Sequence, residues 1–245
     1  MKIELRKRII QTLILSIAVG VLFLASFHWR IKKQITNELD NVQNDEKIRE
    51  DAFQLSEVLG SCVRIQAEGH HGSGSIYQLL DDEIIIVTNW HVLQYWNNED
   101  SYVTFFNGAV GSGKVIAASE QNDIGLLSIK TAFFATEELE GLHAISESDR
   151  ILTRGDALYM VDIASDVWQP EVYEGQVLEP LRYLDEFGME MLYGESLFKP
   201  GMSGCGVFDR EGSYVGMLTA GTDQNEIAAV PLDIIRLCKT WIWIE

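Results

Sequence analysis

The sequence predicts an all-β fold, either a sandwich or a pair of barrels, preceded by one membrane-spanning helix. The first observation is a 21-residue stretch near the N-terminus, residues 9–29, which has no Asp, Glu, Lys or Arg and is long enough to span a bilayer. The second is a series of short apolar runs between glycine and Asx turns, a pattern typical of sandwiches and barrels. These runs are Cys62–Ala67, Ile84–Thr88, Tyr102–Phe106, Ile124–Ile129, Ala157–Ile163, Tyr214–Thr219 and Ile227–Val230.

Residues 9–29 are expected to form a retained signal-anchor helix, with residues 1–8 in the cytoplasm. Four basic residues precede the stretch and three follow it, so the positive-inside rule favours this orientation by a small margin. A cleaved signal peptide is the alternative, but its apolar core would be shorter, and Leu24-Ala25-Ser26 is a poor cleavage site. The expected location is therefore a bacterial cell membrane, crossed once, with the main domain on the extracytoplasmic side.

The segment at residues 30–57 is polar and acidic. Ile35, Leu39 and Val42 recur at helical spacing, which predicts a short helical stalk, although a disordered linker fits equally well. Residues 58–245 then form one domain, because 188 residues suffice for one well-buried core.

The chain is expected to end on a helix. A helical pattern runs from about Leu232 to Trp243. This helix would turn four side chains toward the core: Ile234, Ile235, Leu237 and Cys238.

The predicted domain is strongly acidic. The first 33 positions hold seven of the 19 basic residues and one of the 37 acidic residues, so the remainder holds 12 basic and 36 acidic residues, a formal charge of −24. Such a surface repels nucleic acid, which is excluded as a partner. The three cysteines lack Cys-x-x-Cys spacing, and neither a metal-ligand pattern nor a phosphate-binding glycine loop is present, so no metal or cofactor is expected.

Ser203 is the candidate nucleophile. It lies in Gly201-Met202-Ser203-Gly204, where glycines permit a tight turn whose backbone N–H groups point at one spot and can hold an oxyanion. The pattern by itself is weak, because glycine and serine also mark ordinary turns. Its meaning depends on a base and an acid elsewhere in the chain.

His91 is the candidate base. None of the five histidines follows Ser203, so the Ser–acid–His order of α/β-hydrolases is excluded. His91 directly follows the apolar run that ends at Thr88, and a strand end would hold it rigidly; a histidine that satisfies a buried carbonyl is the alternative. The other histidines lie in the N-terminal apolar segment, in a Gly/Ser-rich turn and in a polar loop: His28, His70, His71 and His143.

Asp123 is the candidate acid. It stands at the start of the run Ile124–Ile129, where a buried carboxylate would orient the imidazole and stabilise its cation. An Asx turn that opens the strand is the alternative. Three such residues in the order His–Asp–Ser, each at a strand edge, favour a catalytic triad over three unrelated turns.

Several ordered motifs resemble those of the trypsin-like serine peptidases, most closely the HtrA/DegP type, over about residues 58–237. The motifs, in chain order, are Gly72-Ser73-Gly74-Ser75-Ile76, Ile86-Val87-Thr88-Asn89-Trp90-His91-Val92, Asn122-Asp123-Ile124-Gly125-Leu126-Leu127, Ser148-Asp149 with Gly155-Asp156-Ala157-Leu158, Pro200-Gly201-Met202-Ser203-Gly204, Gly212-Ser213-Tyr214-Val215-Gly216-Met217 and Ala229-Val230-Pro231-Leu232. The resemblance implies two six-stranded antiparallel β-barrels of the chymotrypsin type and a C-terminal helix. Because the chain ends at Glu245, soon after that helix, no PDZ domain is expected.

The resemblance also implies how the site residues act. His91, Asp123 and Ser203 would form the triad, and the backbone N–H groups of Gly201 and Ser203 the oxyanion hole. Leu197, the sixth residue before the serine, would lie at the base of the first specificity pocket. Since Leu197 is not acidic, a small or medium apolar residue is expected before the cleaved bond. An extended peptide would pair with an edge of three residues: Thr219, Ala220 and Gly221.

The chain departs from the family pattern at two places. Cys205 replaces the glycine usual two residues after the serine, and Asp162-Ile163-Ala164-Ser165 replaces a Gly-Asn-Pro turn. Cys205 is a rival nucleophile, but the Gly-x-nucleophile-Gly frame fits Ser203 and not Cys205. A small buried thiol is the simpler interpretation.

Two functions of different classes follow. The first is a membrane-anchored serine endopeptidase that cleaves proteins or peptides in extracytoplasmic quality control or processing. The second is a catalytically silent trypsin-like domain that binds extended peptides as a membrane-linked sensor. The natural substrate, the oligomeric state and any activation step stay open.

Overall fold

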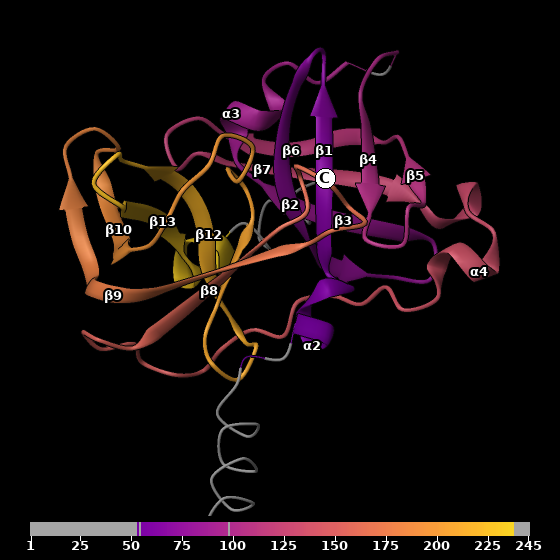
Figure 1. Ribbon diagram of the computed structural model, residues 1–245. Coiled ribbons are helices and arrows are strands. Elements are labelled where there is room, and N and C mark those ends of the chain that lie inside the picture. Colours follow the sequence, from indigo (N-terminus) through magenta and orange to yellow (C-terminus); the bar gives the residue numbers. More distant parts are fainter. Residues whose placement is uncertain (1–52, 54, 98, 238–245) are drawn as a thin grey trace, which may run out of the picture. The chain divides into compact units, whose positions relative to one another are not determined.

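The computed structural model describes residue 53, residues 55–97 and residues 99–237 (Figure 1). The predicted membrane-spanning helix at residues 9–29 and all but the last few residues of the predicted stalk lie outside this part of the chain. Within the described residues, no helix is long and apolar enough to cross a membrane.

The compact unit of the described chain begins at Phe53, five residues before the predicted domain start. The Phe53 ring stacks on that of Tyr159, with the ring centroids 4.4 Å apart. The short helix α2, Leu55–Leu59, follows and buries Val58 in the core. Phe53 and Leu55, at the end of the predicted stalk, are thus partly buried against the core of the domain.

The N-terminal half is a seven-stranded antiparallel sheet in the order β5-β4-β1-β2-β3-β7-β6 (Figure 1). The prediction of a closed six-stranded barrel here is wrong, because no ladder joins β5 to β6. These two edge strands are consecutive in the chain, and only Ser112 and Gly113 separate them. The two edges of the sheet are therefore joined by the covalent backbone and not by a hydrogen-bonded ladder. The strands are β1 Cys62–Ala67, β2 His70–Leu79, β3 Glu83–Thr88, β4 Tyr102–Phe105, β5 Val110–Gly111, β6 Lys114–Ser119 and β7 Ile124–Lys130.

The C-terminal half is a closed six-stranded barrel in the order β10-β13-β12-β11-β8-β9, as predicted (Figure 1). The closing ladder joins β9 to β10, two long strands connected by a tight turn. The strands are β8 Ala157–Asp162, β9 Glu171–Leu184, β10 Met189–Glu195, β11 Gly206–Phe208, β12 Tyr214–Gly221 and β13 Glu226–Pro231.

The remaining elements are short. The described chain ends on the predicted C-terminal helix, α5, Leu232–Leu237, which buries Leu232 and Ile235. Leu237 was expected to face the core but is 59% exposed, because the helix turns only one narrow face to the barrel. The others are α3 Trp90–Leu93, the 3₁₀ turn η1 Thr131–Phe133 and α4 Thr136–Leu139.

Strand β3 explains how the two halves join. Its alternate side chains point to opposite faces, as in any strand. Ile84 and Ile86 lie in the apolar core of the first sheet, whereas Ile85 and Val87 lie in a cluster that also contains residues of the second barrel. Because both faces are buried, the strand has an unbroken apolar sequence, and each such side chain contributes roughly 1.5–3 kcal/mol of transfer free energy. The end of β3 is therefore fixed at the seam between the halves, where the candidate site lies.

Candidate active site

His91 lies at the seam because strand β3 ends there. The strand ends at Thr88, and helix α3, which contains His91, begins two residues later at Trp90. Asn89 keeps an extended backbone, and the single-turn helix α3 then places His91 in its first turn. The side chain of His91 is 38% exposed, so it can meet a substrate while its backbone is held.

The carboxylate of Asp123 holds the imidazole of His91. Nδ1 of His91 lies 2.8 Å from Oδ2 and 3.0 Å from Oδ1, and the backbone N–H of His91 donates to Oδ1 at 3.0 Å. An ionised carboxylate only accepts hydrogen bonds, so Nδ1 carries the proton, and the lone pair of Nε2 is free to act as a base. The structure thus brings together two of the three residues predicted for the triad.

Asp123 has an unusual backbone conformation at the start of β7. Its φ is +48°, in the left-handed region that aspartate and asparagine tolerate better than most residues. The buried amide of Asn89 donates to the Asp123 carbonyl at 3.1 Å and to Oγ1 of Thr219 at 3.0 Å. Asn89 therefore links the base-bearing turn, the acid and strand β12 of the other half. The sequence motif contained Asn89, but its role depends on contacts that the motif does not reveal.

The loop that carries Ser203 is pressed against the first sheet. Gly204 has φ of +88°, and a Cβ on it would collide with the carbonyl oxygen of Ser73 and the hydroxyl of Thr88. The N–H of Ser73 donates to the carbonyl of Ser203 at 2.8 Å. Glycine is thus required at position 204, by conformation and by space alike.

The hydroxyl of Ser203 donates to the carbonyl of Thr219 at 3.3 Å. Among the described residues, no hydrogen bond joins Ser203 to His91. In structures without substrate, the nucleophile–base contact is often loose. The third member of the predicted triad therefore lies at the same seam, with its hydroxyl turned toward β12.

The backbone N–H groups of Gly201 and Ser203 have no acceptor within the described chain. Their neighbours are paired: Met202 donates to the Lys199 carbonyl at 3.1 Å, and Gly204 donates to the Leu218 carbonyl at 2.8 Å. Gly201 has φ of +97°. Two free N–H groups, one on the serine and one two residues before it, fit the predicted oxyanion hole, because an oxyanion needs preorganised donors without another partner.

The loop after β8, at which the sequence departs from the family pattern, is ordered by its own aspartate. Asp162 is buried and accepts the N–H of Ala164 at 2.8 Å and the hydroxyl of Ser165 at 2.9 Å. Ala164 approaches Gly201, since its Cβ would lie 3.6 Å from a Cβ built on that glycine. An Asx turn therefore takes the place of the Gly-Asn-Pro turn beside the candidate oxyanion hole.

Cys205 is a poor nucleophile. It is 2% exposed, and burial raises the pKa of its thiol well above the ordinary value. The thiolate is the reactive form, so a thiol that stays protonated at neutral pH is inert. The structure agrees with the interpretation of Cys205 as a small buried side chain.

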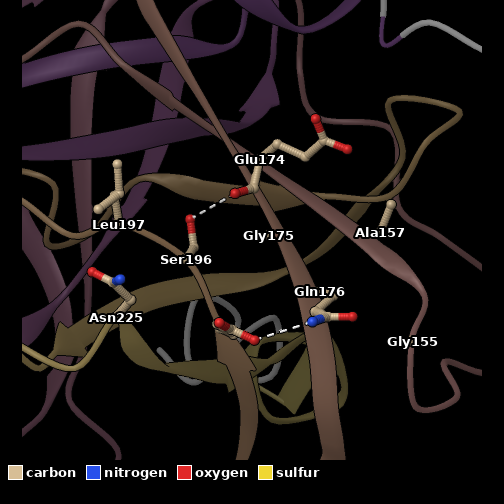
Figure 2. Close-up of a pocket in the computed structure, with 9 residues that line it drawn as sticks. Gly155, Ala157, Glu174, Gly175, Gln176, Ser196, Leu197 and Asn225 are labelled. Atoms are coloured by element: carbon tan, nitrogen blue, oxygen red, sulfur yellow. Dashed lines mark hydrogen bonds between the residues drawn. The ribbon is translucent and has the colours of Figure 1, made fainter.

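Leu197 lies on the second barrel and is 57% exposed. It lines a cavity of about 420 Å³ together with Glu174, Ser196 and Asn225. Figure 2 shows this cavity, in which the Ser196 hydroxyl donates to the Glu174 carbonyl at 3.1 Å. Its role at the base of a specificity pocket stays a prediction.

Phe198, which the sequence analysis did not single out, lies against the predicted peptide-binding edge. A Cβ on Gly221 would collide with Cβ and Cγ of Phe198. Phe198 also packs on the apolar core of the second barrel, which includes Leu192 and Ile227. The Gly221 end of the predicted peptide-binding edge is thus covered by an aromatic side chain.

Two further cavities flank the seam. One, of about 340 Å³, is lined by His91, Asp123, Trp90 and Phe187. The other, of about 280 Å³, is lined by Ala220, Gly221 and the same Phe187. The His91–Asp123 pair and part of the predicted peptide-binding edge, Ala220 and Gly221, therefore each line a cavity. Within the described residues, no group of three or more His, Cys, Asp or Glu side chains is placed to hold a metal ion.

The chain is similar in sequence to several curated serine proteases. The curated relatives named "Serine protease HtrA-like" include one from Staphylococcus epidermidis, 24% identical over 184 residues, which covers 70% of this chain and 30% of that protein. A Staphylococcus aureus relative of the same name is 25% identical over 178 residues, or 67% of this chain and 22% of that protein. The chain thus spans less than a third of the length of these relatives.

A solved structure shares the fold. The crystal structure of Rv3671c from M. tuberculosis H37Rv, a serine-to-alanine mutant in an inactive form, superposes with a TM-score of 0.62 at 14% identity, covering 77% of this chain and 89% of that chain. The family model described as "Trypsin-like peptidase domain" matches residues 60–217, which include the end of β3, Asp123 and the serine loop. The chain belongs to the trypsin-like peptidase domain family.

Proposed function

We propose that the chain is a serine endopeptidase that cleaves proteins or peptides bound as an extended strand. The observation that carries this proposal is the pairing of His91 with Asp123, which fixes the proton on Nδ1 and leaves the lone pair of Nε2 free to accept a proton. The unpaired N–H groups of Gly201 and Ser203 support it, as do the HtrA-like names of the relatives.

The proposed reaction proceeds in two acyl-transfer steps. Nε2 of His91 takes the Ser203 proton as Oγ attacks the peptide carbonyl, and the oxyanion accepts hydrogen bonds from the two N–H groups. His91 then gives the proton to the leaving amine. Water repeats the sequence on the acyl-enzyme, and Asp123 keeps the imidazole oriented throughout.

Substrate binding would also release the nucleophile. The carbonyl of Thr219, which now accepts the Ser203 hydroxyl at 3.3 Å, lies on the edge proposed to pair with the peptide. A peptide N–H that takes this acceptor frees Oγ to turn to His91. The edge thereby couples peptide binding to formation of the Ser203–His91 hydrogen bond.

Two contacts in the structure also support a second candidate function. A hydroxyl held by Thr219 and an aromatic ring held against Gly221 are also what a catalytically silent peptide-binding domain would show. Such a domain would bind extended peptides without cleaving them. The two candidates differ in the reactivity of Ser203.

The location is part of the proposal. We place the peptidase domain on the extracytoplasmic face of a bacterial membrane, anchored by residues 9–29, because that run is uncharged and has more basic residues before it than after it.

Labelling with a fluorophosphonate probe tests the activity and the location together. The purified full-length chain is expected to react, and Ser203→Ala is expected not to react, because only an activated serine attacks the probe. Intact cells treated with a membrane-impermeant fluorophosphonate should label the same band. No labelling of the purified wild type would favour the silent domain, and labelling only after lysis would contradict the extracytoplasmic placement.

Phe198 is expected to restrict the residue that precedes the cleaved bond. Replacing it by alanine removes the ring from Gly221 and opens a space lined by apolar side chains. Wild type is expected to prefer small apolar residues there, and Phe198→Ala to gain about tenfold or more in kcat/KM for phenylalanine or leucine, since each buried methylene contributes about 0.8 kcal/mol.

A peptide library measured with wild type, Phe198→Ala and Leu197→Ala checks this expectation. Leu197 is the matched control, because it is the adjacent residue but lines the separate cavity of Figure 2. A widened preference in Leu197→Ala and an unchanged one in Phe198→Ala would assign the pocket to Leu197 instead.

A further inference from the structure

Ser73 is a buried serine of β2 that lies against the serine loop of the other half. It is 2% exposed. Its hydroxyl donates to the carbonyl of Gly201 at 2.9 Å, and its N–H donates to the carbonyl of Ser203 at 2.8 Å. One residue of the first sheet thus contacts both residues whose N–H groups would form the oxyanion hole.

The bond to Gly201 matters because glycine does not hold its own conformation. Gly201 has φ of +97° and no Cβ, so both of its backbone torsions turn easily. Pro200 restrains the chain before it, since the proline ring fixes its own φ. The hydroxyl of Ser73 restrains the chain after it, by holding the Gly201 carbonyl.

Ser73 is itself held from β3. The hydroxyl of Thr88 donates to the carbonyl of Ser73 at 2.6 Å. Thr88 is fully buried and stands three residues before His91. The restraint on Gly201 therefore comes from the same strand end that positions the base.

We propose that Ser73 is a positioning residue that keeps the N–H groups of Gly201 and Ser203 directed at the oxyanion. The inference rests on the proposed peptidase function and adds to it a residue outside the triad. Ser73 does not touch the substrate. It acts through Gly201, and the rate of the chemical step should depend on its hydroxyl.

The contribution of the Ser73 side chain can be tested separately from that of its backbone hydrogen bonds. The N–H bond from Ser73 to Ser203 and the Thr88 bond to the Ser73 carbonyl use backbone atoms. Ser73→Ala keeps both of them and removes only the bond to Gly201. A loss of rate in this variant therefore reports on orientation of the loop, since the seam between the halves keeps its backbone contacts.

Ser75 provides a matched control on the same strand. It is also fully buried, and its hydroxyl has no hydrogen-bond partner among the described residues. Ser75→Ala removes the same atom from the same strand without removing a hydrogen bond. Thermal unfolding of both variants then shows whether either substitution affects the fold.

The experiment is steady-state kinetics of the full-length protein on a peptide substrate. Ser73→Ala is expected to lower kcat by about three- to tenfold, the factor that one neutral hydrogen bond supplies, with KM within about twofold of wild type. Ser75→Ala is expected to match wild type in both constants. An unchanged kcat in Ser73→Ala, a loss confined to KM, or an equal loss in Ser75→Ala would overturn the proposal.

A crystal structure of Ser73→Ala makes the outcome independent of the proposed function. We expect the Gly201 carbonyl to change its orientation when the hydroxyl is removed. If the wild type neither labels with a fluorophosphonate nor turns over, the peptidase function fails while this structural test still decides the role of Ser73. A Gly201 carbonyl that keeps its wild-type orientation would overturn the positioning role.

Discussion

Replacing Ser203 by alanine is expected to lower kcat for peptide hydrolysis by about four to six orders of magnitude. The alanine has no hydroxyl to form the acyl-enzyme, and the remaining groups, His91, Asp123 and the two free N–H groups, contribute only binding and oxyanion stabilisation. KM should change little, because among the described residues the only hydrogen bond that the hydroxyl donates is to the Thr219 carbonyl. Initial rates of wild type and variant on the same peptide measure the loss.

Cys205→Ala is the matched control for this prediction. Cys205 is the only other nucleophile of the glycine-rich loop, it is buried, and burial raises the pKa of its thiol. Its removal should therefore leave kcat within a fewfold of wild type. If Cys205→Ala loses activity and Ser203→Ala keeps it, the nucleophile has been assigned to the wrong residue.

The strands that could be predicted from the sequence are those that contain a short apolar run. The bounds of β1 at Cys62–Ala67 match the predicted run, and β3 and β7 differ from theirs by one residue. In β3 the side chains from Ile84 to Val87 are divided between the core of one half and the seam, so that run is wholly apolar, whereas β1 contains Arg64 and Gln66. An unbroken apolar run of this length is a strong signal.

Two strands that the apolar runs did not reveal are β9 and β2, whose sequences are interrupted by polar residues and glycine. β9 and β10 pair along most of their length, yet β9 is largely exposed and contains Pro180, so its sequence lacks an apolar run. β2 begins with His70 and His71, which were assigned to a turn because glycine and serine surround them. Those glycines allow close approach to the serine loop: a Cβ on Gly72 would lie 3.2 Å from the carbonyl of Ser203.

In the site, likewise, local sequence patterns could be recognised and long-range contacts could not. His91, Asp123 and Ser203 were recognisable because each stands in a motif with its own spacing. Asn89 stands in the motif of His91, and Ser73 stands in the separate motif Gly72–Ile76, but both hydrogen-bond to partners more than 100 residues away, Thr219 and Gly201. Such partners become adjacent only when the two halves pack, so local sequence gives no signal for them.

Replacing Asp123 by asparagine is expected to lower kcat by about 10⁴-fold while the fold is kept. Asparagine matches the shape of aspartate and tolerates the φ of +48° at this position, whereas alanine there would be strained. The asparagine oxygen can still accept the N–H of His91, which Oδ1 now accepts at 3.0 Å. The amide nitrogen then faces Nδ1, and since it is a donor, Nδ1 must give up its proton and act as the acceptor.

The proton consequently moves to Nε2, where the lone pair is needed to receive the Ser203 proton, so the imidazole is held in the wrong tautomer. Fluorophosphonate labelling of Asp123→Asn should slow by a similar factor, because the same proton transfer activates the serine toward the probe. Asp82→Asn makes the same chemical change at an exposed turn residue that is paired with Lys130, and it should label like wild type. If Asp123→Asn labels and turns over at the wild-type rate, the contact between Asp123 and His91 is structural only, and Ser203 is activated without it.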